Sequence, residues 1–160
     1  MDTSILQVFS RKGGEAIVAS SLGDTPGLSC RTTDYTSMPL SPRQWLVTSV
    51  NGADCHLKDV LQRDLGNSVY LSEQSHSRII IRVAGEGARE LLQKGCRLDL
   101  HESRASSGFC AQTAMAQIGV LIHQVDELPT YDLHIYSGFA QSFWHWLTEM
   151  AAPHGYKVIS

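Results

Sequence analysis

The sequence predicts an α+β fold in which two ferredoxin-like βαββαβ units pack as one domain. Three observations carry this prediction. Short β-rich runs alternate with amphipathic helical stretches, nearly the same order of elements occurs in both halves, and the composition is that of a globular protein, with 42% hydrophobic and 18% charged residues in 160. That length suits one compact domain. We expect a single domain over residues 1–160, with half-units of about 1–74 and 75–160.

The first half predicts the order strand, helix, strand, strand, helix, strand. The strands are expected at residues 5–10, 28–33, 44–50 and 69–72, and the helices at 15–22 and around a stripe of Leu57, Val60, Leu61 and Leu65. Asn51 is a candidate N-cap for the second helix, and Gly66 ends it. Residues 36–42 hold two prolines and are predicted to be a loop.

The second half repeats this order with one extra strand. Strands are expected at residues 78–84, 109–117, 120–125, 131–136 and 156–159, and a first helix runs from residue 88 to about Gly95. Gly119 marks either a tight turn or a bulge. Ser137 is a candidate cap for the strongest helix, whose apolar positions are Ala140, Phe143, Trp144, Leu147, Met150 and Ala151. Helices cover one face of each sheet, so the opposite face needs cover from the other half or from a partner.

Charge and hydropathy exclude several classes of protein. The net charge is −3 and the 13 Lys and Arg residues are scattered, so a nucleic-acid-binding protein is disfavoured. No apolar run approaches the ~18 residues of a membrane helix, and the N-terminus lacks the pattern of a signal peptide. Without CxxC pairs, the four cysteines are expected to be reduced thiols in a cytoplasmic protein; they are Cys30, Cys55, Cys96 and Cys110.

The turn from residue 83 to 89 resembles a dinucleotide-binding loop because it carries Gly85 and Gly87 between a strand and a helix. The third glycine of that motif would fall at Glu90, whose carboxylate would repel a pyrophosphate. We therefore interpret the segment as a tight strand-to-helix turn.

Histidines and a cysteine raise the questions of a metal and of a nucleophile. None of the seven histidines forms an i, i+4 pair; they are His56, His76, His101, His123, His134, His145 and His154. His123 and His134 are expected to lie near each other across paired strands, but no third ligand is evident. Cys110 begins a strand near His123, and we interpret it as a buried structural thiol because nothing indicates an activating base.

Two further clusters have simpler interpretations. Asp126 and Glu127 are expected to be solvated residues of a turn. The last helix carries an aromatic cluster of Phe139, Phe143, Trp144 and Trp146, in which Phe143 and Trp144, together with Leu147, are predicted to be core residues. His145 and Trp146 lie off that stripe. An exposed Trp is a candidate anchor for a partner, but burial of both tryptophan rings in the core is the preferred interpretation. No catalytic, cofactor-binding or metal-binding residue is assigned.

Blocks of sequence in the second half resemble one known family. The blocks are RVAGEGARELLQKGC at residues 82–96, LDLH at 98–101, CAQT at 110–113, VLIHQ at 120–124, YDL at 131–133 and WHWL at 144–147. This pattern is similar to that of the sarcosine oxidase gamma subunit family, most densely over residues 78–147. Arg97 stands where the family tends to have proline.

The resemblance implies a fold similar to the folate-binding domain of the glycine-cleavage T-protein. It further implies a non-catalytic role in a heterotetramer with alpha, beta and delta subunits, which oxidatively demethylates sarcosine or a related N-methyl amino acid. FAD, FMN, NAD, folate and zinc are then expected in the partner subunits and none in this chain. The alternatives are a stand-alone folate-binding or one-carbon-transfer module, and a scaffold for an unrelated partner.

Overall fold

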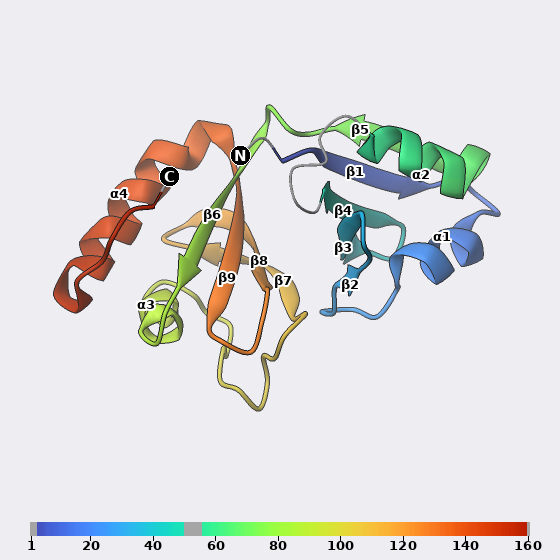
Figure 1. The fold of residues 1–160 in the computed structure, drawn as a ribbon. Coiled ribbons are helices and arrows are strands. Elements are labelled where there is room, and N and C mark those ends of the chain that lie inside the picture. The colour runs from blue at the N-terminus through green and yellow to red at the C-terminus, as the bar shows by residue number, and fades with distance from the viewer. Residues whose placement is uncertain (1–2, 50–55, 160) are drawn as a thin grey trace. The chain divides into compact units, whose positions relative to one another are not determined.

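The structure is a computed structural model of the chain, and it describes residues 3–49 and 56–159. The chain divides into two compact units, Met1–Arg78 and Ile79–Ser160. Each unit has its own sheet and its own core, and the elements are labelled in Figure 1. The fold is α+β with two antiparallel sheets, as two ferredoxin-like units require, so the predicted fold class is confirmed. That the units form one domain stays a prediction.

The first unit contains five strands and two α-helices among its described residues. The elements are β1 (Ile5–Ser10), α1 (Glu15–Leu22), β2 (Cys30–Arg31), β3 (Tyr35–Ser41), β4 (Gln44–Ser49), α2 (Leu57–Leu65), a 3₁₀ turn (Gly66–Ser68) and β5 (Val69–Glu73). The sheet order is β2-β3-β4-β1-β5, and every pairing is antiparallel. The order β3-β4-β1-β5 is the ferredoxin-like arrangement, with β2 added at its edge.

One face of this sheet packs against both helices. The core consists of Leu6, Val8, Tyr35, Trp45, Val47 and Val69 from the strands, and Val18, Leu22, Leu57, Leu61 and Leu65 from the helices. Trp45 is buried, and its indole N–H donates a hydrogen bond to the carbonyl of Gly23 at 2.6 Å. Gly23 ends α1 at a φ of 74°, a backbone conformation that favours glycine.

The prediction of a loop at residues 36–42 was wrong, because most of this segment is β3. Pro39 has no N–H to donate, yet it lies opposite Trp45 and beside a register shift between Pro39 and Ser41. The short β2 pairs only with Thr36 and Ser37, so Pro39 faces no strand on its other side. Proline is tolerated at such edges and bulges. The candidate cap Asn51 lies outside the described residues.

The second unit repeats the topology of the first. Its elements are β6 (Arg78–Ala84), α3 (Ala88–Gln93), β7 (Cys110–Met115), β8 (Ile118–Gln124), β9 (Thr130–Tyr136), a 3₁₀ turn (Ser137–Phe139), α4 (Ala140–Ala151) and a 3₁₀ turn (Ala152–His154). The sheet order is β6-β9-β8-β7. If β6 is equated with β1 and β7, β8 and β9 with β2, β3 and β4, this order is that of the first sheet without its β5.

The extra strand predicted in the second half is present as β8, and the first unit has a matching strand, β3, where a loop was predicted. Both units have a three-strand meander between their helices, and residues 156–159 form no strand in the structure. Gly119 lies within β8, and the turn before it is formed by Ala116 and Gln117, whose φ values are 48° and 67°. Ser137 does not cap α4, because a 3₁₀ turn separates it from the helix start at Ala140.

The core of the second unit lies between its sheet and the two helices α3 and α4. Strand residues Met115, Val120, Ile122, Tyr131, Leu133 and Ile135 contact Leu91 and Leu92 of α3 and Phe143, Leu147 and Ala151 of α4. The three α4 residues recur every four positions, which places them on one side of the helix. The strand residues that alternate with this core therefore lie on the opposite face of the sheet.

Candidate functional site

A row of polar side chains crosses the second sheet on the face away from α3 and α4. In the register of the sheet, Cys110 of β7 lies opposite His123 of β8, and His123 lies opposite Asp132 of β9. Directly opposite residues of antiparallel strands have Cβ atoms about 4.5–5.5 Å apart. Arg82 of β6 completes this polar row, because its guanidinium donates two hydrogen bonds to the Asp132 carboxylate, at 2.7 and 2.8 Å.

The polar row holds the residue types of a cysteine nucleophile site but not its electrostatics. Cys110 is 1% exposed, and burial raises the pKa of its thiol from 9.0 to about 11. A nucleophilic thiolate needs a lowered pKa, so Cys110 is a protonated thiol at neutral pH. Asp132 is engaged by the two-pronged ion pair with Arg82, which is a stabilising arrangement of the strands β6 and β9.

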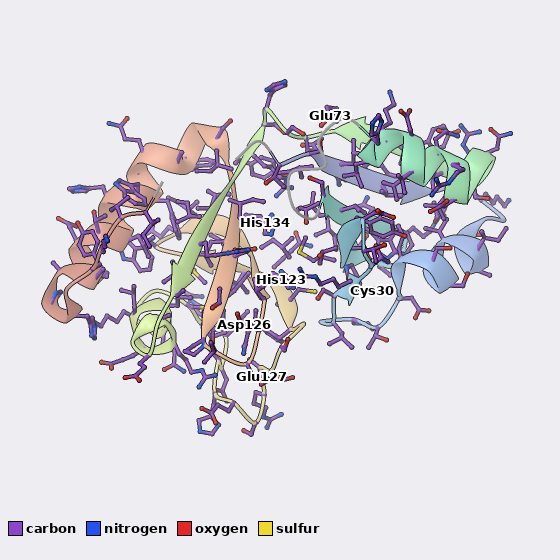
Figure 2. The ribbon with its side chains drawn as sticks, viewed as in Figure 1. Cys30, Glu73, His123, Asp126, Glu127 and His134 are labelled. Carbon is purple, nitrogen blue, oxygen red and sulfur yellow. The ribbon has the colours of Figure 1, made fainter. Side chains whose placement is uncertain are left out.

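The two buried histidines lie diagonally on this same face. His134 is opposite Leu121, two residues from His123 across the β8–β9 pair, and Figure 2 labels both histidines on this sheet. The predicted proximity follows from this register. Within the described parts of the chain, no group of three or more His, Cys, Asp or Glu residues could hold a metal ion.

The other histidines are exposed. His56 pairs with Asp59 at 3.8 Å, His145 with Glu149 at 3.4 Å, and His154 lies 2.7 Å from Lys94 Nζ, while His101 contacts Ser103 Oγ at 3.0 Å. These are local contacts within helices, turns and the α3–α4 contact. His76 is also exposed.

The glycine turn after β6 packs against the end of α4. Gly85 adopts a φ of 120°, and Gly87 is the N-cap of α3, a helix of only six residues with Glu90 in its first turn. A Cβ at Gly87 would lie 3.7 Å from Nδ1 of His154. The turn therefore connects β6 to α3 and contacts a side chain of its own unit.

The acidic pair lies in the loop between β8 and β9, as Figure 2 shows. Glu127 is exposed and accepts a hydrogen bond from the Ser107 amide at 3.4 Å, while Asp126 is half-buried. Among the other cysteines, Cys30 is half-buried, Cys96 is buried, and Cys55 lies outside the described residues. The hydrogen bond to Asp132 raises the pKa of the Arg82 guanidinium in the polar row, and the negative charge of Asp126 adds to this shift.

Of the two tryptophans of α4, both of which the sequence favours as core residues, only Trp146 packs in the core. Trp144 is 41% exposed, whereas Trp146 packs against the core with its ring 5.4 Å from that of Phe143. The reason is the neighbouring α3: Gly95 follows that helix and has no side chain, so the Trp146 indole fills the space.

Trp144 belongs to a group of exposed aromatic residues around the start of α4. Tyr136 and Phe139 are 47% and 52% exposed and lie just before the helix. We call Tyr136, Phe139 and Trp144 the aromatic patch. The sequence alone does not predict this patch, because the apolar stripe of the helix assigns Trp144 to the core.

The fold and its side chains indicate the class of protein. It is an α+β protein of two ferredoxin-like units, with a neutral thiol and an ion pair on one sheet and exposed aromatic residues beside the last helix. Comparison with known proteins narrows this class. The family model described as "Sarcosine oxidase, gamma subunit family" matches residues 16–153. The chain belongs to the sarcosine oxidase gamma subunit family. No curated protein sequence matches it.

Two of the solved structures that match the chain show the shared fold. Heterotetrameric sarcosine oxidase from Corynebacterium sp. U-96, in complex with pyrrole 2-carboxylate, has a chain that superposes with a TM-score of 0.83 at 22% identity, over 99% of this chain and 84% of that one. Glycine cleavage system aminomethyltransferase T from Bartonella henselae superposes with a TM-score of 0.65 at 14% identity, over 92% of this chain and 43% of that one. The predicted likeness to the T-protein fold is confirmed. None of the helices in residues 3–49 and 56–159 has the length and apolarity to cross a membrane.

Proposed function

We propose that this chain is the non-catalytic gamma subunit of a heterotetrameric sarcosine-oxidase-type flavoenzyme. The complex oxidatively demethylates sarcosine or a related N-methyl amino acid, and this chain serves its structure and assembly. The observation that carries the proposal is the family match over residues 16–153. The raised pKa of the Cys110 thiol supports it, because the polar row is unsuited to covalent catalysis.

The partners in this proposal are an alpha, a beta and a delta subunit in the cytoplasm. FAD, FMN, NAD, folate and zinc are held by those chains and not by this one. The Corynebacterium enzyme that shares the fold is described as heterotetrameric, which supports a complex of this kind.

The aromatic patch is the surface that we assign to a partner subunit. Exposed Trp and Tyr side chains are enriched among the residues that dominate protein interfaces. Trp144 and Phe139 are exposed at the start of α4, and the polar His145 follows Trp144 on the helix. This arrangement resembles an apolar interface centre with a polar rim.

Co-expression of the chain with the flavin-bearing subunits tests the proposal. We expect a yellow complex to co-purify with a tagged form of this chain, and Trp144→Ala to weaken its assembly by roughly 30-fold or more. The matched control is Glu149→Ala, an exposed residue of the same helix outside the aromatic patch that should leave assembly unchanged. A chain that stays colourless and monomeric beside its co-expressed flavin subunits would refute the proposal. Assembly that W144A leaves intact would refute only the docking surface.

The shared fold with aminomethyltransferase T favours a second candidate, a stand-alone folate-binding module. Titration of the isolated chain with tetrahydrofolate, followed by calorimetry, distinguishes the two. Saturable binding would support this candidate. The absence of heat at millimolar ligand would remove it.

A further inference from the structure

Cationic side chains gather where β1 of the first unit ends and the chain turns into α1 (Figure 1). Arg11 and Lys12 follow Ser10, the last residue of the strand, and the Ser10 amide donates a hydrogen bond to the carbonyl of Arg43 at 3.0 Å. We call Arg11, Lys12 and Arg43 the cationic patch. The whole chain has 16 acidic and 13 basic side chains, so the patch has the opposite sign to the net charge. It is therefore a local feature that an anionic partner can recognise.

One carboxylate pairs with the cationic patch among residues 3–49 and 56–159. Glu15 lies 3.6 Å from the Arg43 guanidinium and accepts a hydrogen bond from the Gly13 amide at 2.7 Å. The hydrogen bond from its own amide lowers the pKa of the Glu15 carboxyl, and the Gly13 amide and Arg43 add to this shift. Within the same described ranges, neither Arg11 nor Lys12 forms an ion pair. The patch thus binds one carboxylate already and keeps the positive charges of these two side chains.

Tyr70 of β5 holds the Arg11 side chain in position. The guanidinium carbon of Arg11 lies 4.0 Å from the centre of the Tyr70 ring, which is a cation–π contact. Arg11 Nε is buried and has no hydrogen-bond partner in the part of the chain that the structure describes. This guanidinium has lost part of its hydration without gaining a carboxylate, so an anionic partner would stabilise it more than it would a fully hydrated arginine.

The surroundings of Arg11 favour a protein segment as that partner. Tyr70 is 59% exposed, and Tyr and Arg are the residue types that dominate the binding energy of protein interfaces. A carboxylate is the anion that this chain's arginines bind, as Arg43 does with Glu15 and Arg82 with Asp132. Nucleic acid is a poorer match, because its backbone needs a longer series of cations than the two that remain here.

We propose that the cationic patch and Tyr70 bind an acidic segment of a partner subunit, with an Asp or Glu carboxylate of that segment paired to the Arg11 guanidinium. This inference rests on the proposed function, because it takes the partner to be a subunit of the flavoenzyme. It gives the first unit a charged contact of its own, whereas the aromatic patch belongs to the second unit.

Charge reversal tests the proposal in the complex of this chain with its co-expressed flavin-bearing subunits. In Arg11→Glu, the affinity of the tagged chain for those subunits should fall at least about tenfold at low salt, because like charges then oppose each other. Lys12→Glu changes an exposed side chain and should act in the same direction. The matched control is Arg31→Glu, which alters the net charge equally at an exposed position of β2, a strand separated from β1 by β3 and β4. It should leave the affinity unchanged.

The role of the aromatic ring has its own pair of variants. Tyr70→Leu removes the ring that holds Arg11 and should lower the affinity by about two- to fivefold. Tyr70→Phe keeps the ring and should have no effect. The flavin absorbance that the immobilised chain retains, measured over a range of subunit concentrations, gives the affinity of every variant.

Three results would overturn the proposal. Equal losses in Arg11→Glu and Arg31→Glu, or no loss in either, would overturn this inference alone, because the complex still forms. Saturable binding of inorganic phosphate that Arg11→Glu abolishes, together with an unchanged affinity for the subunits, would assign the patch to a free oxyanion. An unmodified chain that joins no flavin-bearing subunit would overturn the proposed function, and this inference with it.

Discussion

Replacing Gly95 with alanine tests the packing of α4 on the end of α3. Gly95 has no positive φ, so the backbone accepts alanine, and the lower entropy of the unfolded chain alone would stabilise the protein by about 0.4–1 kcal/mol. The added Cβ would, however, overlap Cζ2 of the Trp146 indole and lie 2.7 Å from Cη2. The indole cannot move freely because it packs on the Phe143 ring. We expect a net loss of about 1–3 kcal/mol in the free energy of unfolding.

Urea denaturation followed by far-UV circular dichroism measures this loss. Gly119→Ala is the matched control, because a Cβ added at Gly119 would meet nothing within 4 Å, so only the entropy of the unfolded chain should act and the variant should be stabilised by about 0.4–1 kcal/mol. In a Trp146→Leu background, G95A should be neutral or stabilising, since the overlapping atoms are gone. An equal cost of G95A in both backgrounds would refute the assigned clash.

Three further predictions concern single groups. Arg82→Gln leaves the mostly buried Asp132 carboxylate without its partner and should lower the free energy of unfolding by about 1–2 kcal/mol in chemical denaturation. Asp132→Asn leaves an exposed guanidinium and should lower it by less. The reverse order of the two losses would contradict a stabilising ion pair around a buried carboxylate. Burial raises the pKa of the Cys110 thiol to about 11, above its value of 9.0 in an unfolded chain. The folded protein therefore holds this proton more tightly than the unfolded chain does. The stability that the thiol contributes is complete below about pH 9 and is lost as the pH rises toward 11. In Cys110→Ala, the melting temperature should therefore decrease less between about pH 9 and 11 than it does in the unmodified protein. An equal decrease in both proteins would argue against a raised thiol pKa. The buried Ser37 Oγ donates a hydrogen bond of 2.6 Å to the carbonyl of Leu22 at the end of α1, so Ser37→Ala should lower the free energy of unfolding by about 1 kcal/mol. Ser20 is exposed, and Ser20→Ala should leave it almost unchanged. Equal melting temperatures of the two variants would count against the Ser37 hydrogen bond.

Elements bounded by glycine were predictable to the residue. β1, α1 and β6 begin and end where the sequence places them, because Gly14, Gly23 and Gly85 interrupt clear alternation or helical spacing. The strand β3 was not predictable from proline content. Its Pro39 is tolerated only because β2 is too short to pair with it, and that is a property of the assembled sheet.

The polar row illustrates why a site depends on register. Proximity of Cys110 and His123 follows from two neighbouring strands, but the addition of Asp132 and Arg82 requires the alignment of all four strands. The alignment of β7 with β8 is set by the two-residue turn at Ala116 and Gln117, where both φ values are positive. Neither residue is a usual choice for such a turn, and a shift of one residue would have moved every side chain to the other face.

The three tryptophans of the chain are distributed unevenly between the two units. Trp45 is enclosed in the core of the first unit, so its emission should be shifted to short wavelength and resist collisional quenchers. The second unit carries the exposed Trp144 and the half-buried Trp146, whose emission should respond to iodide and to any protein that covers α4. The chain thus contains separate optical reporters of its two cores, and no external dye is needed to follow them.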